Sequence, residues 1–341
     1  MATKKVTSLE VAKLAGVSQS AVSRVFTPGA SASKKTNEKV LSAAAELGYR
    51  PNILARSLIT GKSRIIGLVV SHLDNYFYPE ALELLSNALQ KKGYHVLVFM
   101  ASKTSGNIDD VVDEILDYQV DAIILASIAM SSNLANRCVA AGVPVMLFNR
   151  SQDDDRFSTV TSDNFLGGQK VARFLIAGGH KRIGYIAGWE GASTQHDREA
   201  GFIEELKQHG SSLYAREVGN FNQDEARQAT RKMFSKKEIP DAVFVASDDM
   251  AFAVMDVIRF ELELKIPEQV SVVGYDDVPV ASWPAYDLTT VRQPANRMVA
   301  ETVSIILECI ENPETKPLRI EIDGPLILRG SAKISNISNK E

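Results

Sequence analysis

Residues 7–25 read TSLEVAKLAGVSQSAVSRV, and this stretch decides the fold of the N-terminal part of the chain. Thr7 and Glu10 have the spacing of a capping box, which predicts that a helix begins there. Gly16 supplies a tight turn, and Ser18 can cap a second helix with a polar outer face. Two short helices joined by a glycine-containing turn form a helix-turn-helix unit, whose second helix enters the DNA major groove. The sequence therefore predicts a DNA-binding headpiece.

The charge of the chain is distributed unevenly. Residues 1–64 hold eleven Lys and Arg side chains and three acids, a net charge of +8. The other 277 residues hold 27 basic and 39 acidic side chains, so the formal charge of −4 hides a positive end on an acidic body. This asymmetry favours contact with phosphate by the N-terminal end alone.

Length and composition narrow the class of protein. A chain of 341 residues exceeds a usual single core and predicts two or three folding units. Cys138 and Cys309 show no CxxC or zinc-ligand spacing, so we expect no disulfide framework, no metal and no cofactor. The N-terminus lacks a secretory hydrophobic region, and no apolar run approaches membrane-spanning length. These features predict a cytoplasmic protein without a membrane partner.

The remainder of the headpiece is predicted as a third helix over 34–47, capped by Ser33 and ended by Gly48. A conditional linker helix is expected over 52–58, because that segment has helix formers but is too short to be stable alone. The headpiece core is expected to contain Val40, Leu41, Ala44 and Leu47 packed over Leu9, Leu14 and Val22. The expected divisions are a headpiece 1–50, a hinge 51–62, a core 63–333 and a short tail 334–341.

From Ile65 onward the sequence alternates strand and helix patterns. The predicted strands are 65–70, 95–100, 122–125, 143–148, 159–162, 183–187, 242–245 and 270–274. The predicted helices lie near 79–92, 108–118, 131–141, 165–178, 196–209, 223–235, 249–264 and 295–311. Left-handed glycines are expected at the helix ends at Gly93, Gly142, Gly178 and Gly210. Eight such units suit two parallel sheets better than one, with a cleft in which ligands bind beyond the strands' carboxyl ends.

Several phrases in this order and spacing resemble the LacI/GalR family of bacterial transcription regulators over nearly the full chain. They are Val11–Ser18, Ala21–Val25, Leu47–Asn52, Ala55–Leu58, Ile66-Gly67, Gly179–Ile183, Val273–Asp277 and Leu328–Ser331. The resemblance implies an N-terminal all-α helix-turn-helix headpiece and an α/β periplasmic-binding-protein-like core of two doubly wound parallel-sheet lobes. It further implies a repressor that binds a pseudopalindromic operator as a homodimer and is switched by a sugar or related metabolite in the interlobe cleft.

The resemblance also assigns residues to double-stranded DNA. Gln19 and Ser20 open the second helix as base-reading side chains, and Arg24 can reach guanine or phosphate. In the hinge, Leu58 would wedge into a base step through the minor groove, although it can also pack against its dimer mate. The full set of expected DNA-binding residues is Thr7, Ser8, Ser18, Gln19, Ser20, Ser23, Arg24, Asn52, Ala55, Arg56 and Leu58. Without the other matching segments, a polar helix face exposed only to solvent would explain these residues as well as contact with DNA does.

The ligand site implied by the resemblance draws on both lobes. Its residues are Asn75, Phe77, Asn149, Asp163, Arg198, Phe221, Ser247, Asp276 and Gln293. Arg198 can hold hydroxyl pairs or an anionic group, and Phe221 can stack on an apolar ring face. Structural alternatives remain open at this point: Asp276 can cap the next segment, Asp248 can cap a helix, and the two phenylalanines can belong to the core.

Three other classes of protein compete with a ligand-controlled regulator. A cytoplasmic solute-binding protein would share the two lobes but has no use for the headpiece. An enzyme is not expected, because the chain has no P-loop, no Gly-x-Ser-x-Gly elbow and no zinc motif. A constitutive DNA-binding protein would lack effector control. The short sequence after Lys333 has no room for heptads, which favours a dimer over a tetramer.

Overall fold

The structure is a computed structural model that describes residues 6–27, 30–50, 61–71, 73, 75–101, 108–128 and 131–334. The chain divides into two compact units, with the boundary between Ser63 and Arg64. The expected hinge helix, 52–58, and all of the expected tail except Ile334 lie outside the described residues. Among the described residues, no helix is both long and apolar enough to cross a membrane.

The N-terminal unit contains the three predicted helices. They are α1 (Ser8–Ala15), α2 (Gln19–Val25) and α3 (Lys34–Leu47). The capping box is present, with the Thr7 amide donating to Glu10 Oε2 at 2.7 Å and the Glu10 amide donating to Thr7 Oγ1 at 3.4 Å. Ser18 and Ser33 cap the next two helices, and Gly16 and Gly48 end α1 and α3 in the left-handed conformation. The prediction of a helix-turn-helix with a third helix is confirmed.

The headpiece core differs from the predicted one. Leu9, Leu14 and Leu41 are 50%, 46% and 52% exposed, so their predicted burial is wrong. The capped start of α1 places Val11 and Ala15 on its inner face, and Leu9 and Leu14 then lie about 100° to either side of that face. The buried residues are Val11, Ala12, Ala15, Val22, Val40, Ala43 and Ala44. Small side chains here let the three helices pack closely.

One of the two lobes of the larger unit, lobe 1, is a six-stranded sheet with helices on both faces. Its strands, in spatial order, are β11 (Arg319–Ile322), β5 (Ser158–Ser162), β4 (Val145–Phe148), β3 (Ala122–Ala126), β1 (Ile65–Val70) and β2 (His95–Met100). All neighbouring strands are parallel. Its helices are α5 (Phe77–Lys91), α6 (Ile108–Asp117), α7 (Ser132–Ala140) and α12 (Ala295–Glu311).

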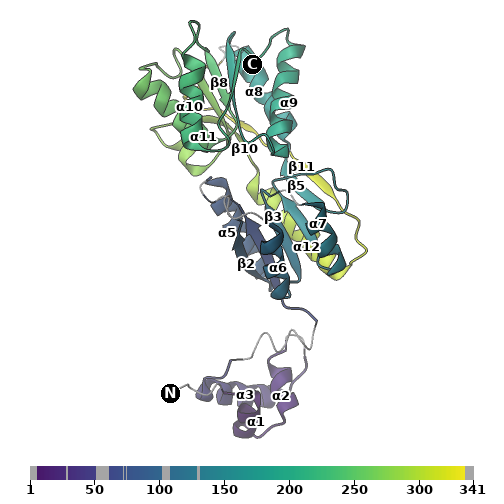
Figure 1. The fold of residues 1–341 in the computed structure, drawn as a ribbon. Helices are drawn as coiled ribbons and strands as arrows, with labels where there is room; N and C mark the ends of the chain where they lie inside the picture. Colours follow the sequence, from purple (N-terminus) through teal and green to yellow (C-terminus); the bar gives the residue numbers. More distant parts are fainter. Residues whose placement is uncertain are drawn as a thin grey trace, which may run out of the picture. The chain divides into compact units, whose positions relative to one another are not determined.

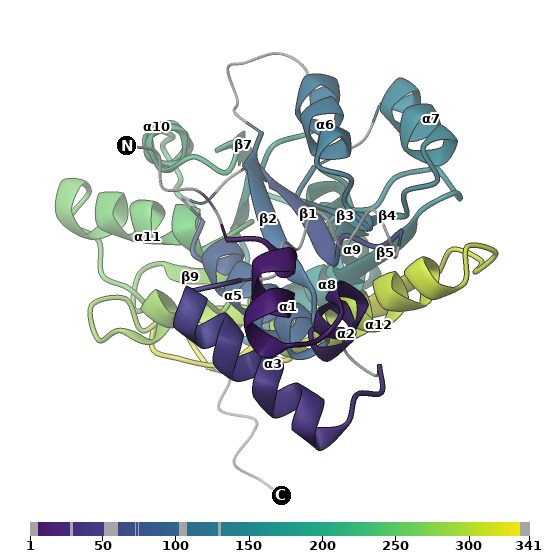
Figure 2. The same cartoon turned by 90° about the horizontal axis from the view of Figure 1, so that it is seen from below.

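Alternate strand residues supply the two apolar layers of lobe 1. Val69, Ile123 and Leu147 pack in one cluster with residues of α6 and α7. Leu68 and Ile124 point the other way and pack with residues of α5 and α12. Figure 2 shows the same arrangement, with α6 and α7 on one side of the strands and α5 and α12 on the other. The four inner strands, β5, β4, β3 and β1, are buried on both faces, as expected of a parallel sheet, while the edge strands β2 and β11 are partly exposed.

Lobe 2 repeats this architecture. Its strands, in spatial order, are β12 (Leu326–Ile327), β10 (Thr289–Arg292), β9 (Ser271–Asp276), β8 (Ala242–Val245), β6 (Ile183–Ala187) and β7 (Ala215–Val218). Its helices are α8 (Asn164–Ala177), α9 (Ser193–Gln208), α10 (Gln223–Phe234) and α11 (Asp248–Asp256). Figure 1 shows α8 and α9 on one side of the sheet and α10 and α11 on the other.

The predicted helices and strands of both lobes are all present, with most bounds shifted by three residues or fewer. The helix expected over 249–264 is shorter, because α11 gives way to a π-helical segment over Val257–Glu261. The predicted strands all pair in parallel, while β12, which was not predicted, runs antiparallel to β10. One expectation is wrong: Gly178 is right-handed, while Gly179 has φ +81°. The helix end therefore takes its left-handed residue one position later than predicted.

The chain crosses between the lobes three times within residues 131–334. The crossings join β5 to α8, β10 to α12 and β11 to β12. Each lobe is therefore built from discontinuous pieces of sequence. Because the carboxyl ends of parallel strands lie at one edge of each sheet, residues that follow the strands can converge on a shared cleft.

Candidate functional site

The DNA-facing candidates of the headpiece lie at the start of α2. Gln19, Ser20, Ser23 and Arg24 are all exposed, so their side chains are accessible to a partner. Gln19 Nε2 donates to Ser8 Oγ at 2.9 Å, which ties α2 to the first residue of α1. The first turns of both helices thus present their polar side chains and unpaired backbone amides together, the arrangement that binds phosphate oxygens.

Of the other candidates, two cap helices and four lie outside the described residues. Thr7 and Ser18 are N-caps, and Ser18 Oγ lies 2.9 Å from Ser20 Oγ. Asn52, Ala55, Arg56 and Leu58 lie outside the described residues. Their assignment to DNA stays a prediction.

A cavity of about 690 Å³ lies between lobe 1 and lobe 2. Eight of the nine predicted ligand residues line it: Asn75, Phe77, Asn149, Arg198, Phe221, Ser247, Asp276 and Gln293. Asp163 does not, because its carboxylate accepts a hydrogen bond from the Leu166 amide at 2.8 Å and caps α8. The volume is within the range of small-molecule sites.

Arg198 is held rigidly in the wall of this cavity. It is 2% exposed, and its guanidinium carbon lies 3.4 Å from the centre of the Tyr275 ring. Its NH2 donates to Asn164 Oδ1 at 2.7 Å and its NH1 donates to the Ala246 carbonyl, while Nε has no partner among the described residues. These two hydrogen bonds fix the orientation of the cation and leave its Nε–H, among other donors, for a ligand.

Two glycines allow Arg198 to take this position. A Cβ on Gly168 of α8 would lie 2.1 Å from the Arg198 carbonyl oxygen, and a Cβ on Gly201 of α9 would lie 2.0 Å from the Phe165 carbonyl oxygen. The two helices therefore touch through their backbones, which neither sequence periodicity nor charge reveals. This close approach sets the depth at which Arg198 enters the cavity.

A chain of side chains connects the lobes at the back of the cavity. Ser162, the last residue of β5, donates to Gln293 Oε1 at 3.0 Å. Gln293 Nε2 donates to Asp276 Oδ1 at 2.6 Å, and Asn75 Nδ2 approaches Asp276 Oδ2 at 3.4 Å. The Asp276 carboxylate thus accepts from side chains at the cavity instead of capping the next segment. A ligand that competes for Asp276 or Gln293 would act on the contact between lobes.

Buried carboxyl groups lie beside this connection. Ser247 caps α11, and Asp248 inside the first turn is fully buried, accepting from Thr290 Oγ1 at 2.6 Å and from the Val278 amide at 3.0 Å. Burial raises the pKa of Asp248 to about 8, with the nearby Asp276 adding to the shift. Burial also raises the pKa of Asp276 to about 6, against the opposing effect of Arg198. The alternative that Asp248 is the helix cap is wrong, since Ser247 has that role.

The buried Asp248 predicts a pH dependence of stability. Between its ordinary pKa near 4 and its folded value of about 8, the folded protein binds more protons than the unfolded chain. The melting temperature of the core is therefore expected to fall as pH rises through this window. Asp248→Asn should flatten the dependence, because its amide can accept from Val278 and donate to Thr290 without ionising. Melting curves at several pH values check this.

The exposed Asp224→Asn is the matched control, because its side chain is 87% exposed. It should leave the pH profile unchanged. A profile for Asp248→Asn that falls as steeply as that of the wild type would contradict the assignment.

Sequence reasoning missed more than half of the cavity wall. The additional lining residues are Ser71, Tyr78, Ala101, Ser127, Ile128, Arg150, Trp189, Thr194, Asn220, Asn222 and Glu225. Several follow a strand end directly or by one residue, such as Ser71 after β1, Ser127 after β3 and Arg150 after β4. The strand predictions contained this signal, because every residue just beyond a strand is a candidate for the cleft.

Backbone strain gathers at the same place. Ser127, Asn149, Asn220 and Phe221 all line the cavity and have φ between +52° and +63°. Non-glycine residues in this left-handed region cost free energy and concentrate at functional sites. The turns after β3, β4 and β7 therefore have backbone conformations of higher local energy, and these conformations place their residues in the cavity wall.

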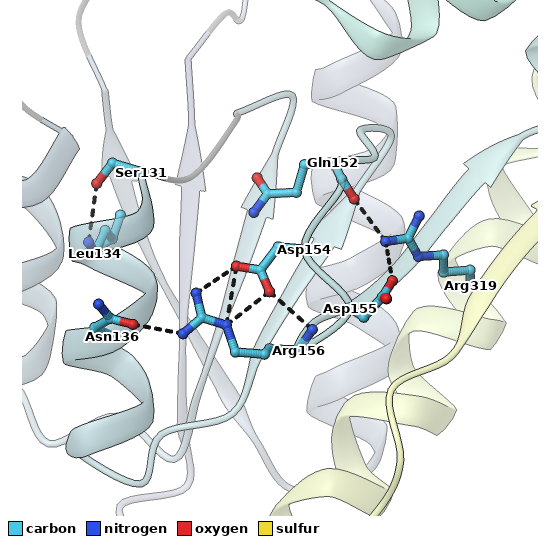
Figure 3. A network of polar contacts seen from close by, with 8 residues as sticks. All are labelled: Ser131, Leu134, Asn136, Gln152, Asp154, Asp155, Arg156 and Arg319. Carbon is cyan, nitrogen blue, oxygen red and sulfur yellow. Dashed lines mark hydrogen bonds and ion pairs between the residues drawn. The ribbon is translucent and has the colours of Figure 1, made fainter.

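The acidic run Asp153–Asp155 lies in a surface loop, where it forms ion pairs. Arg156 binds the Asp154 carboxylate with both Nε and NH2, and Arg319 NH2 lies 2.7 Å from Asp155 Oδ1 (Figure 3). The Arg156 hydrogen bonds hold the pKa of Asp154 below its usual range. None of these three aspartates lines the cavity. Among the described residues, no cluster of His, Cys, Asp or Glu could hold a metal ion.

Two family models match parts of the chain. Residues 8–52 match the bacterial regulatory proteins of the lacI family, and residues 172–332 match the periplasmic binding protein-like domain. The HTH-type transcriptional regulator CelR of Thermobifida fusca is 33% identical over 331 residues, covering 94% of this chain and 96% of that protein.

Two solved structures are similar over 96% of this chain. A transcriptional regulator CelR–cellobiose complex has a TM-score of 0.73 at 30% identity and is covered in full. The lac repressor dimer bound to operator and the anti-inducer ONPF has a TM-score of 0.87 at 28% identity, with 99% of that chain covered. The relatives have the names of transcriptional regulators and repressors, not of enzymes.

Proposed function

Because the chain belongs to the lacI family of bacterial regulatory proteins, we propose that it is a homodimeric repressor controlled by a small polar effector. Its headpieces bind the two halves of a pseudopalindromic operator in the cytoplasm. The effector, a sugar or related metabolite, binds between the lobes and changes operator affinity. Two similar structures support the DNA-binding and ligand-binding parts, since one is a repressor dimer on operator DNA and the other a regulator–cellobiose complex.

The observation that carries this proposal is the composition of the cavity wall. Asn75 and Asn149 come from lobe 1, and Arg198 and Asp276 come from lobe 2. A ligand held by both sets has a different affinity for each angle between the lobes. It can therefore shift the protein between two states, by no more than that difference in affinity.

The base-reading role is proposed for Gln19, Ser20 and Arg24. Gln can pair bidentately with adenine and Arg with guanine, while the capping residues Thr7 and Ser18 position the headpiece through phosphate contacts. Ser8 and Ser23 belong to the positioning group. In the hinge, Asn52 and Arg56 are proposed to contact phosphate, and Ala55 to permit close approach of the paired hinge helices on the DNA.

A selection followed by a titration tests the proposal. The full chain is first used to select duplexes from a random library, and a palindromic consensus is expected. Operator affinity is then measured against sugars, sugar phosphates, sugar acids and nucleosides. At least one compound that binds the protein should change operator affinity by about 5-fold or more.

The outcomes separate the remaining alternatives. Equal affinity for unrelated duplexes would identify a constitutive DNA-binding protein. Ligand binding that never alters operator affinity at saturation would identify a solute-binding protein.

Leu58→Ala is expected to weaken operator binding by ~3 kcal/mol, the order of the free energy that an intercalating wedge contributes at one base step. Ligand affinity should not change. Fluorescence anisotropy with the selected operator measures the first and calorimetry the second. Leu41→Ala, in the half-exposed part of α3, is the control for loss of a headpiece leucine. If Leu58→Ala binds the operator as tightly as the wild type does, Leu58 does not act as an intercalating wedge.

A further inference from the structure

A second buried arginine lies in the wall of the cavity. Arg150 follows β4 by one residue, is 4% exposed and lines the cavity. Its NH2 donates to the Ser127 carbonyl at 3.1 Å and to Ser127 Oγ at 3.0 Å. Its Nε and NH1 have no hydrogen-bond partner among the described residues. Arg150 is thus anchored at one nitrogen and has donors left at the other two.

No carboxylate of the described residues forms an ion pair with Arg150. Burial lowers the pKa of Arg150, the Tyr78 hydroxyl opposes this shift, and the charge of Arg198 adds to it. Burial is the larger cause. Arginine nevertheless stays protonated, so an unpaired cation remains in a place where an unpaired charge costs several kcal/mol.

The two acids of the cavity wall do not offset this charge. Asp276 accepts from Gln293 and Asn75, and Glu225 accepts from Asn220 Nδ2 at 2.6 Å. Neither is within ion-pair distance of Arg150 or Arg198. The cavity therefore contains two buried guanidinium groups and, among the described residues, no carboxylate bound to either.

We propose that the effector is an anion, a small polyhydroxylated molecule whose carboxylate or phosphoryl group accepts a hydrogen bond from an unpartnered donor of Arg150, Nε or NH1. Its hydroxyl groups bind on the other side, at Arg198, Asp276 and the unpartnered Asn149 Oδ1. This inference rests on the proposed ligand-controlled function and restricts its effector to acids. A neutral sugar would leave the Arg150 donors unsatisfied in a water-poor site, which disfavours it.

The test uses matched neutral and acidic probes with the full chain. Glucose is compared with glucuronate, gluconate and glucose 6-phosphate, and galactose with galacturonate. Melting temperature and calorimetric affinity are measured for the wild type, Arg150→Met and Arg150→Lys. At least one acid should bind the wild type more tightly than its neutral partner, and Arg150→Met should weaken that acid by ~30-fold or more. Which acids bind separates carboxylate from phosphoryl recognition.

Arg156→Met is the matched control, since it removes one positive charge from the same lobe at an exposed position. It should leave the affinity for the acid unchanged, and Arg150→Lys should retain part of it. If Arg150→Met does not fold, the wild type decides: at least one acid should bind it more tightly than the matched neutral sugar, and equal or weaker binding of every acid contradicts the proposal.

The proposal is overturned if Arg150→Met binds the acid as the wild type does. It is equally overturned if the neutral probes bind better, or if no acidic probe stabilises the wild type. Operator affinity is measured separately. An acid that binds through Arg150 without changing operator affinity would support this inference and contradict the proposed function. A neutral sugar that binds better than the acids and releases the protein from the operator would support the proposed function and contradict this inference.

Discussion

Arg198→Met is expected to reduce effector affinity by ~30-fold or more, the cost of removing one partner from a buried charged contact. The substitution removes the cation from the cavity wall and leaves Asn164 Oδ1 and the Ala246 carbonyl without their donor. Both effects lower ligand affinity, because the ligand loses a contact with the guanidinium and the cavity wall loses two hydrogen bonds. Calorimetry with the panel compound that binds the wild type most tightly measures the change.

Two comparisons isolate the contribution of Arg198. Lys207→Met removes a positive charge from an exposed position on the same helix, α9, and should leave affinity unchanged. Operator affinity without effector should also stay near that of the wild type, because the headpiece forms a separate unit. Wild-type ligand affinity for Arg198→Met would show that the guanidinium serves the fold alone.

Gly168→Ala is expected to lower the melting temperature of the core by roughly 5–10 °C, as overpacking costs a few kcal/mol in a domain of this size. The added methyl would lie 2.1 Å from the Arg198 carbonyl oxygen and 2.8 Å from the Phe202 amide nitrogen. Both are backbone atoms of α9, so α9 must move away from α8 as a whole. Thermal unfolding followed by circular dichroism measures the loss.

The same movement should weaken ligand binding, because it displaces Arg198. Gln169→Ala is the control: it adds no atoms, lies one residue further along α8 and is only partly buried. Its effect on stability should stay within about 0.5 kcal/mol. A Gly168→Ala protein that melts with the wild type and binds ligand normally would contradict the close helix contact.

Sequence patterns predicted local structure well where a local rule applied. The capping box at Thr7, the cap at Ser33 and the left-handed Gly48 bound their helices as expected. Strands with continuous apolar runs, such as 65–70 and 183–187, have the predicted bounds. In contrast, β7, β10, β11 and β12 were not predicted, because β12 has only two residues and the other three are short and carry charged or polar residues.

Some residues of the candidate site were predicted from the sequence, and others were not. Arg198, Asp276 and Gln293 were assigned from motifs, and the structure brings them to one cavity. Asp163 was assigned with them but caps a helix, because its short side chain meets the free amides of α8 first. Arg150 belonged to no motif, and nothing in its local sequence distinguishes a buried arginine from an exposed one.

The sequence by itself determined the helix-turn-helix, the strand–helix alternation and the family, since these depend on spacing between residues close along the chain. Only the tertiary structure decided which residues share the cleft, because three crossings bring together groups such as Asn75 and Asp276, 201 residues apart. It also decided that the cleft holds two buried arginines without a bound carboxylate. Burial and ion pairing are properties of packing, and packing joins residues that sequence spacing leaves unrelated.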